Sequence, residues 1–422
     1  MAPLGPFEPR PRIAIAVSGG ADSLACALLA ATWATARDGG AVGLVVDHAL
    51  RPDSAAEARL TAERLRSRGI EAHILTVATL PPGPALAERA RIARYALLEA
   101  ACAERGLLHL LLGHHAADQA ETIALRLLRR SGPAGLAGMA ALSEHRTVRL
   151  LRPLLTIPPA CLRATLRAAG QAWIDDPSNH TQTATRNRLR LLRADADGAG
   201  PATAASLQAA AWRATGRAAA ERETATHLGQ TLRIHPAGYA LLPPEPPPPA
   251  ALAALLRALT GAPYPPPAAA IAAWCARPRP ATLAGIRILR AGRLAPGDWL
   301  LVREAAAMEP DRLCRPGVTW DNRHRVLAAP AGLTIGPLGP QAATLRHLSP
   351  LPAAILQTLP ALRCAGRLFA VPQLGYCEGD GIERIRIVFD PVHPAAGAPF
   401  FASAAGDLHR GFAECAPATY LS

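Results

Sequence analysis

The stretch Ala16-Val17-Ser18-Gly19-Gly20-Ala21-Asp22-Ser23 lies between an apolar run, Ile13–Val17, and an Ala- and Leu-rich segment, Leu24–Thr35. The run predicts a buried strand and the segment a helix, which places the motif at a strand-to-helix turn. Its two glycines let the backbone approach a ligand closely, and the following helix offers free N–H groups and the positive end of its dipole. The turn therefore predicts a site for an anion such as pyrophosphate, with the Ser18 and Ser23 hydroxyls as further donors.

An acidic residue, Asp22, lies inside this predicted anion site. A carboxylate repels a phosphate unless a cation stands between them, and Mg²⁺ commonly bridges the two. A glycine-rich turn with an Asp near a helix start is the simpler interpretation. This simpler interpretation explains the glycine pair alone. It does not explain why an acid and two hydroxyls accompany the glycines in the same turn. We therefore predict a phosphate site that uses Mg²⁺.

Strand and helix patterns alternate through the first half of the chain. Apolar runs at residues 43–46, 72–77, 107–112 and 148–151 predict further strands, with helical patterns between them. Such alternation predicts an α/β fold with a doubly wound parallel sheet. Ligands of these sheets bind beyond the carboxyl ends of the strands, where the polar motifs of this chain lie.

The composition changes after this α/β region. Residues 204–233 and 251–277 are helical in composition, and the proline run within Leu241–Ala250 predicts an extended spacer between them. From Asp311 onward the chain is rich in Pro and Gly and carries short β-like runs. We therefore expect three domains: residues 1–197, a helical linker and middle domain at 198–310, and a small C-terminal domain at 311–422.

The chain is strongly basic, with a net charge of +13, and all 45 basic residues are arginine. The lack of lysine excludes a Walker A loop, a lysine Schiff base and Ser-Lys catalysis. An excess of positive charge favours a polyanionic partner such as a nucleic acid. Between Arg146 and Arg193, nine arginines stand against two acids, Asp175 and Asp176. A solvated basic face in an arginine-rich protein is the alternative interpretation of this stretch.

Eight cysteines are scattered along the chain without a CxxC pair or a His/Cys ligand spacing. They therefore predict neither a disulfide framework nor a zinc site. No apolar run reaches the roughly 18 residues of a membrane span, and the first residues do not resemble a signal peptide. We expect a cytoplasmic protein without a membrane partner.

Further motifs follow the glycine-rich turn along the chain. They are Val46-Asp47-His48-Ala49-Leu50-Arg51, Ala90-Arg91-Ile92-Ala93-Arg94-Tyr95, Leu112-Gly113-His114-His115-Ala116-Ala117-Asp118-Gln119-Ala120-Glu121-Thr122, Arg129-Arg130-Ser131-Gly132-Pro133-Ala134-Gly135-Leu136-Ala137-Gly138-Met139, Asp176-Pro177-Ser178-Asn179 and Arg186-Asn187-Arg188-Leu189-Arg190. In this order and at these intervals they resemble the tRNA(Ile)-lysidine synthetase family, a branch of the N-type ATP pyrophosphatases. The resemblance covers residues 12–193.

This resemblance implies an adenine nucleotide alpha hydrolase-like fold and a ligase that uses ATP. Members adenylate C2 of the wobble cytidine of the isoleucine tRNA that carries a CAU anticodon. Free L-lysine then displaces AMP and gives lysidine, so that ATP is split into AMP and pyrophosphate. The implied partners are this tRNA and lysine, with ATP as substrate and Mg²⁺ as cofactor. The C-terminal domain is expected to bind the tRNA, and the oligomeric state is left open, with a homodimer among the states considered.

The place of each residue within these motifs predicts its role in the site. Ser18, Gly19, Gly20, Ala21, Asp22 and Ser23 are expected to bind ATP. Asp22, His114, Asp118 and Glu121 are expected to be catalytic, with Asp22 and Asp118 as the Mg²⁺ ligands. His114 and Asp118 would share a face near the nucleotide if their stretch were helical. The arginines expected to bind tRNA are Arg91, Arg94, Arg129, Arg186, Arg188 and Arg190.

One position departs from the family pattern, because relatives usually carry two adjacent acids where this chain has Ala117 and Asp118. We expect Asp118 to be the more important of the pair, since it keeps the Gln-x-Glu-Thr context. Three alternative functions stay open. A tRNA thiolase of the same superfamily would need cysteine pairs, and an amide-forming synthetase would not need the basic stretch. A tRNA-binding protein without catalysis is favoured by Ala117 alone.

Overall fold

The computed structural model describes residues 1–47, 49, 53–77, 83, 86–175, 195, 197–379 and 381–402. The chain divides into two compact units. The first comprises Met1–Ala219 and a second stretch that starts at Ala398, and the other comprises Ala220–Gly397. In sequence, therefore, the second unit is inserted into the first.

The first unit contains a six-stranded sheet made of β1 (Arg12–Val17), β2 (Gly40–Asp47), β3 (Glu71–Thr76), β4 (His109–Leu112), β5 (Leu142–Glu144) and β6 (Arg149–Leu151). The strand order is β3-β2-β1-β4-β6-β5. All neighbouring pairs are parallel except β5 and β6, which are antiparallel. The predicted doubly wound α/β fold is confirmed, and the antiparallel edge strand β5 was not predicted.

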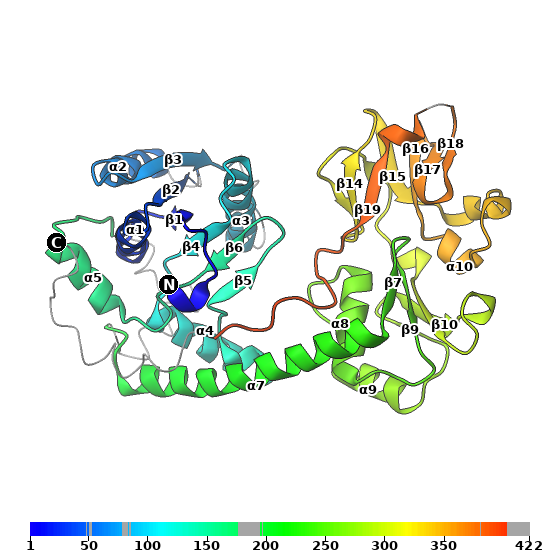
Figure 1. Cartoon of the computed structure of the whole chain (residues 1–422), viewed down its shortest axis with the longest axis horizontal. Coiled ribbons are helices and arrows are strands. Elements are labelled where there is room, and N and C mark those ends of the chain that lie inside the picture. Colours follow the sequence, from blue (N-terminus) through cyan, green and yellow to red (C-terminus); the bar gives the residue numbers. More distant parts are fainter. Residues whose placement is uncertain are drawn as a thin grey trace. The chain divides into compact units, whose positions relative to one another are not determined.

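Helices of the first unit include α1 (Ala21–Thr35), α2 (Ser54–Arg66), α3 (Leu86–Glu104), α4 (Ala116–Leu128) and α5 (Pro159–Ala168), which accompany the sheet in Figure 1. Successive residues of a strand point to opposite faces of its sheet. Ile13 and Ile15 of β1 accordingly enter a core shared with α1, α2 and α5. Ala14 enters a second core, which includes residues of α3. Helices therefore cover both faces, and the turns at the carboxyl ends of the strands are left to form a site.

A long helix, α7 (Pro201–Thr231), follows this α/β region. Its buried residues within the first unit recur at spacings of three and four and mark one helical face. They are Thr203, Leu207, Ala210, Ala214 and Ala218. The predicted helix at 204–233 is confirmed. Neither α7 nor any other helix in the described ranges combines the length and the apolar composition that a membrane crossing requires.

The second unit begins with an antiparallel sheet of β7 (Arg233–His235), β8 (Tyr239–Leu242), β9 (Ala281–Leu283), β10 (Ile286–Arg290) and β11 (Trp299–Arg303). Its order is β7-β8-β11-β10-β9. The helices α8 (Pro249–Thr260) and α9 (Ala268–Ala276) pack on it through a core that includes Leu252, Ile271 and Trp299. The helices predicted in this region are thus present, together with a sheet that the sequence did not predict.

The proline run at Leu241–Ala250 lies within this layer of sheet and helices. β8 precedes the run and β11 follows it, yet the two strands pair with each other. The indole N–H of Trp299 donates a hydrogen bond to the Pro244 carbonyl (3.3 Å). The prediction of an extended spacer is therefore wrong, because the run connects two parts of one packed layer and contacts its core.

The remaining strands form two small antiparallel sheets, β12-β15-β16-β17-β18 and β13-β14-β19. Their bounds are β12 (Arg312–Leu313), β13 (Thr319–Trp320), β14 (His324–Ala328), β15 (Leu333–Pro337), β16 (Pro360–Cys364), β17 (Arg367–Val371), β18 (Tyr376–Cys377) and β19 (Arg386–Phe389), and a short helix, α10, spans Ala353–Leu356.

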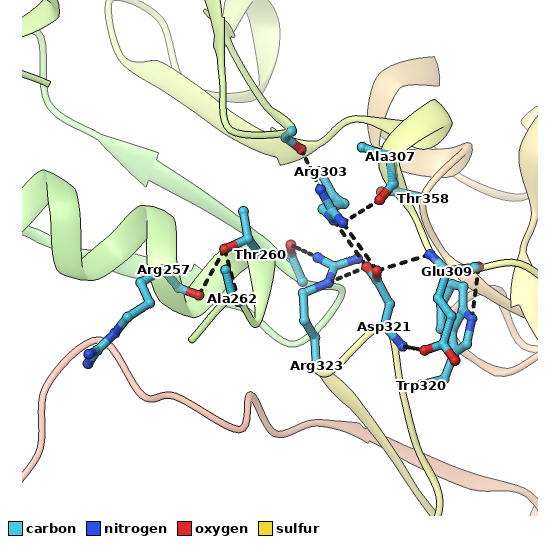
Figure 2. A network of polar contacts seen from close by, with 12 residues as sticks. Arg257, Thr260, Ala262, Arg303, Ala307, Glu309, Trp320, Asp321, Arg323 and Thr358 are labelled. Carbon is cyan, nitrogen blue, oxygen red and sulfur yellow. Dashed lines mark hydrogen bonds and ion pairs between the residues drawn. The ribbon is translucent and has the colours of Figure 1, made fainter. Parts of the chain in front are cut away.

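A buried ionic network joins these sheets to the preceding layer, as Figure 2 shows. Asp321, between β13 and β14, accepts hydrogen bonds from Arg303 Nε of β11 (3.2 Å) and from Arg323 Nε (2.8 Å). Arg323 also donates to the Gly238 carbonyl (3.3 Å). The three side chains are almost inaccessible to water, so each charge depends on the others for compensation.

Candidate active site

The predicted anion turn links β1 to α1, and its polar groups are bonded to one another. Gly20 is the N-cap of α1, with an extended backbone (φ −73°, ψ 160°). The Ser23 hydroxyl accepts from the Ser18 N–H (3.1 Å), donates to the Gly20 carbonyl (3.0 Å) and lies 3.2 Å from the Ser18 hydroxyl. These bonds fix the turn at the start of α1, where the first N–H groups of a helix lack partners within it.

Gly19 is required by its conformation and by its surroundings. Its φ of +86° lies in the left-handed region, which residues with a Cβ rarely adopt. A Cβ at this position would also lie 2.5 Å from Thr61 Oγ1 and 3.1 Å from Ile174 Cδ1. The Ile174 N–H donates to the Gly19 carbonyl (2.9 Å). Thr61 and Ile174 therefore pack against Gly19 and restrict the turn. The sequence did not single out either residue.

The loop after β4 brings Asp118 to Asp22. Gly113 makes this approach possible, because a Cβ there would lie 2.9 Å from the Asp22 carbonyl oxygen. His115 Nε2 lies 3.4 Å from Asp22 Oδ2 and 3.5 Å from Asp118 Oδ2. Two carboxylates from the ends of neighbouring strands thus converge on one imidazole nitrogen.

His115 also begins α4 through a capping box. Its Nδ1 accepts from the Asp118 N–H (3.4 Å), and Asp118 Oδ2 accepts from the His115 N–H (3.1 Å). An accepting Nδ1 leaves the proton on Nε2, the atom that faces the carboxylates. The acid three residues after a polar N-cap is the sequence signal that could have identified this residue.

The premise that His114 and Asp118 share a helical face is wrong, because α4 begins at Ala116. His114 lies outside the helix, and its Nδ1 is buried without a hydrogen-bond partner among the described residues. Burial lowers the pKa of His114 to about 4, with the Asp118 charge opposing this shift and nearby arginines reinforcing it. His114 is therefore neutral at physiological pH.

The arginines that affect His114 form a cluster with Tyr95. Arg91 Nη2 donates to the Tyr95 hydroxyl (3.4 Å), and its guanidinium carbon lies 5.0 Å from the centre of the ring. Arg94 lies 5.7 Å from the same ring centre. Arg152, just after β6, also interacts electrostatically with Tyr95, and burial lowers the pKa of Arg152. The structure thus places Arg91 and Arg94 beside the site and adds Arg152, which the sequence did not single out.

The remaining predicted residues differ in their exposure. Glu121 is buried in α4, one turn after Asp118, whereas Arg129 is exposed at the C-cap of the same helix. Next to Arg129, Leu127 and Leu128 are 63% and 67% exposed. Several predicted residues lie outside the described part of the chain: Asp176, Pro177, Ser178, Asn179, Arg186, Arg188 and Arg190.

Ala117 lies close to Gly198 and to the start of α5. A Cβ placed on Gly198 would come within 3.2 Å of the Ala117 Cβ and 2.6 Å of Pro159 Cδ. Ala117 therefore lies between α5 and the turn before α7. Within the described ranges, no three His, Cys, Asp or Glu side chains form a ready-made metal cage. Asp22 and Asp118 together supply two carboxylates.

Comparison with known proteins identifies similar chains. Residues 2–194 match the family described as a PP-loop domain. A tRNA(Ile)-lysidine synthase of Bradyrhizobium sp. is 39% identical over 276 residues, which cover 61% of this chain and 77% of that one. A tRNA(Ile)-lysidine synthase of Caulobacter vibrioides is 34% identical over 371 residues, covering 84% of each chain. Among solved structures, a U34-tRNA thiolase from Methanococcus maripaludis has a TM-score of 0.42 and 16% identity, covering 50% of this chain and 74% of that one.

Proposed function

Since the chain belongs to the tRNA(Ile)-lysidine synthase family, we propose that it joins free L-lysine to C2 of the wobble cytidine of an isoleucine tRNA with a CAU anticodon. ATP is split into AMP and pyrophosphate as the cytidine is adenylated and lysine then displaces AMP. The observation that carries this proposal is the meeting of Asp22 and Asp118 at His115, beside the Ser18–Ser23 turn. Adenylation needs an anion site for the departing pyrophosphate and a neutralising charge next to it.

The Ser18–Ser23 turn is proposed to hold the ATP phosphates. Gly19 and Gly20 present backbone close to the ligand, and the start of α1 directs its free N–H groups and its positive dipole end toward the same place. Thr61 and Ile174 fill the space behind Gly19, so the turn has little freedom to move when ATP binds. The turn is thus formed before its ligand arrives, which lowers the entropic cost of binding.

Asp22 and Asp118 fit a Mg²⁺ ion that binds together with ATP. Magnesium sites commonly use one or two carboxylates with phosphate oxygens and waters in place of an all-protein cage. The side chains of Asp22 and Asp118 are 38% and 21% exposed, so their oxygens are accessible to such an ion. When bound, the ion would neutralise charge on the leaving pyrophosphate. His115 orients both carboxylates through its Nε2.

The cluster of Arg91, Arg94 and Arg152 around Tyr95 is proposed to bind phosphates of the tRNA near the anticodon. Guanidinium groups pair with phosphate oxygens in a bidentate manner, and burial strengthens such pairs. Neutral His114 adds a hydrogen-bonding group without adding charge. Glu121, buried below Asp118, completes the proposed catalytic set.

Further tRNA contacts are proposed for Arg129 at the exposed end of α4. By resemblance they are also proposed for Arg186, Arg188 and Arg190, and for the C-terminal domain. Other tRNAs share the CAU anticodon, so discrimination needs contacts beyond the anticodon loop. The reaction is proposed to take place in the cytoplasm, where tRNA, ATP and free lysine meet.

The chemistry of the three buried cysteines among the described residues disfavours their use by a thiolase. Burial raises the pKa of Cys26 and of Cys102 to about 12, and that of Cys314 to about 11. A thiol reacts as its thiolate, so these side chains are poor sulfur carriers at neutral pH. Cys26 and Cys102 lie in the cores on opposite faces of the sheet. They therefore cannot act as a pair.

The test is tRNA-dependent incorporation of labelled lysine together with ATP-dependent release of pyrophosphate. The full-length protein should incorporate lysine into the CAU isoleucine tRNA and should require Mg²⁺. Asp22→Ala should abolish AMP formation while the protein stays folded, because Asp22 is a partly exposed residue in the first turn of α1. Pyrophosphate release without lysine incorporation would point to another ligase of the superfamily. Near wild-type AMP formation by Asp22→Ala would refute the assigned metal and phosphate site.

A further inference from the structure

The C-terminal part of the described chain returns to the catalytic unit and adds to its sheet. We name Phe400–Ala402 the return segment. The Ala141 N–H donates to the Phe401 carbonyl (2.8 Å), and Leu142 and Phe401 form an antiparallel bridge. Leu142 belongs to β5, the edge strand of the catalytic sheet. The return segment therefore pairs with an edge that would otherwise present unpaired backbone groups.

Phe400 anchors this segment. Its side chain is buried, with 8% of the residue exposed, in a small apolar cluster with Ala137, Ala214 and Ala218. The guanidinium carbon of Arg217 lies 4.3 Å from the centre of the Phe400 ring, a cation–π distance. Arg217 also donates to the Ala134 carbonyl (3.0 Å). The ring thus packs between α7 and the residues that follow α4.

The residues that follow α4 form the clamped loop, defined as residues 134–141. Helix α4 holds this loop through two side chains. Gln119 Nε2 donates to the Met139 carbonyl (3.0 Å), and the Met139 N–H donates to Gln119 Oε1 (2.7 Å). Arg126 donates to the carbonyls of Gly135 and Gly138, each at 2.7 Å. The loop therefore has α4 on one side and Phe400 on another.

The clamped loop also contacts the cationic cluster. Arg152 Nη1 donates to the Ala140 carbonyl (2.9 Å), and the same guanidinium interacts electrostatically with Tyr95. The next residue of the loop, Ala141, donates to the Phe401 carbonyl. Adjacent residues of the loop thus contact the return segment and Arg152. A displacement of the loop would move Arg152, because their hydrogen bond tolerates little change in distance.

We propose that Phe400 is a positioning residue for tRNA modification. It holds the return segment on β5, which keeps the clamped loop and Arg152 in the place where the cationic cluster meets the tRNA. The segment that completes the catalytic unit thus comes from the far end of the sequence, after the inserted second unit. This inference rests on the proposed function, because it takes the tRNA to be the ligand of the cluster.

The experiment compares Phe400→Ala with Phe400→Leu in the full-length protein. Leucine keeps most of the apolar volume in contact with Ala137, Ala214 and Ala218, whereas alanine leaves it empty. Phe7→Ala is the matched control, since it removes a ring from the same unit. Phe7 packs on Trp33 and on His109, the first residue of β4, at the amino end of that strand, whereas the site lies at the carboxyl ends of the strands. The measurements are hydrogen exchange of a peptide covering the clamped loop, tRNA affinity, and the kcat and KM for ATP and tRNA.

Phe400→Ala should increase the hydrogen-exchange rate of the Ala141 N–H by at least about tenfold. Without the Phe400 ring the return segment can separate from β5, and this N–H then loses its acceptor, the Phe401 carbonyl. The KM for tRNA should rise by at least about fivefold, with the KM for ATP within about twofold of wild type, since the anion turn is not contacted. Phe400→Leu should restore both values to near wild type. Phe7→Ala should change neither, even if it lowers the melting temperature equally.

Unchanged exchange in the clamped loop of Phe400→Ala would overturn the proposal, as would faster exchange with an unchanged KM and affinity for tRNA. Equal rises in the tRNA KM for Phe400→Ala and Phe7→Ala would also overturn it, because a general loss of stability would then explain both. If wild-type protein incorporates no lysine, the proposed function fails. The exchange and tRNA-affinity measurements would still decide whether Phe400 positions the loop.

Discussion

Replacement of Gly19 by alanine tests whether the anion turn is held in the form that the structure shows. The substitution adds one methyl group at a residue with a φ of +86°. That methyl would lie 2.5 Å from Thr61 Oγ1, and Thr61 is itself 1% exposed with its hydroxyl bonded to the Glu57 carbonyl. The neighbour cannot move away easily, so the turn has to shift.

The magnitude has two parts. A residue with a Cβ in the left-handed region costs on the order of 1–3 kcal/mol, and an extra methyl in a filled space typically costs about 1–3 kcal/mol more. If the protein relaxes by displacing the turn, the cost appears as lost ATP binding. Two kcal/mol, the lower bound, corresponds to roughly a 30-fold loss in kcat/KM for ATP.

The assay is pyrophosphate release as a function of ATP concentration, together with thermal unfolding. Gly20→Ala is the matched comparison, since a Cβ there lies 3.7 Å or more from its neighbours and the backbone is ordinary. It should keep the wild-type melting temperature, whereas Gly19→Ala should not. The double variant Gly19→Ala/Thr61→Ala should recover part of the loss, because it removes the clash and leaves only the backbone strain. A Gly19→Ala protein with wild-type kcat/KM, or a double variant no better than the single one, would refute this account of the turn.

Three further predictions concern the acid pair, the second unit and pH. Asp118→Asn should lower the rate of adenylation by at least ~10²-fold, as expected for a lost electrostatic contact. Residue 117 lies near Gly198, and Ala117→Asp should be neutral or mildly activating. Pyrophosphate release measures both variants, and a strong loss of activity in Ala117→Asp would contradict the expectation. Asp321→Ala should lower the free energy of unfolding by about 3–5 kcal/mol, because Arg303 and Arg323 would stay buried without their counter-charge. Glu383 and Arg384 form an exposed ion pair (3.9 Å), so Glu383→Gln should cost less than about 1 kcal/mol when both variants are measured by urea titration. Similar values for the two variants would argue against the network. The pKa of His114 is about 4 in the folded protein against an ordinary 6.5, so the unfolded chain binds a proton more readily. Its contribution to stability is therefore present above pH 6.5 and is lost as pH falls toward 4. His114→Gln should flatten the dependence of unfolding free energy on pH in that window, and an unchanged slope would show that His114 is not buried in its neutral form.

Much of the catalytic sheet could be predicted from local patterns. The apolar runs that became β1, β2, β3, β4 and β6 are short and lie between helical patterns, and this alternation is sufficient for a parallel sheet. The edge strand β5 was missed because it has three residues, Leu142–Glu144, with one buried side chain, which is too little for a periodic signal. The sheet of the second unit was missed for a related reason, since its strands are separated by helices and a proline run.

Some residues of the candidate site could likewise be predicted from the sequence, and others could not. The sequence predicted the anion turn and Asp118, because each is a compact motif next to a strand. It placed His114 on one face with Asp118 on the condition that the stretch is helical, and the structure instead makes His115 the N-cap that contacts both acids. A shift of one residue at the start of the helix decides which imidazole faces the carboxylates. Hydrophobic periodicity predicts that a helix is present but does not fix its first residue.

The sequence by itself determined the strand–turn–helix arrangement around Gly19 and Gly20, and with it the kind of ligand, because glycine conformation, hydroxyl donors and a helix dipole act over a few neighbouring residues. The tertiary structure alone decided which distant residues complete the site. Gly113 permits the approach of His115 to Asp22, Arg152 joins Arg91 and Arg94 at Tyr95, and Phe401 pairs with Leu142 across most of the chain. These contacts depend on strand order and on the packing of side chains that are far apart in sequence. Local periodicity carries no information about either, because it reports only which face of an element is buried and not what lies against it.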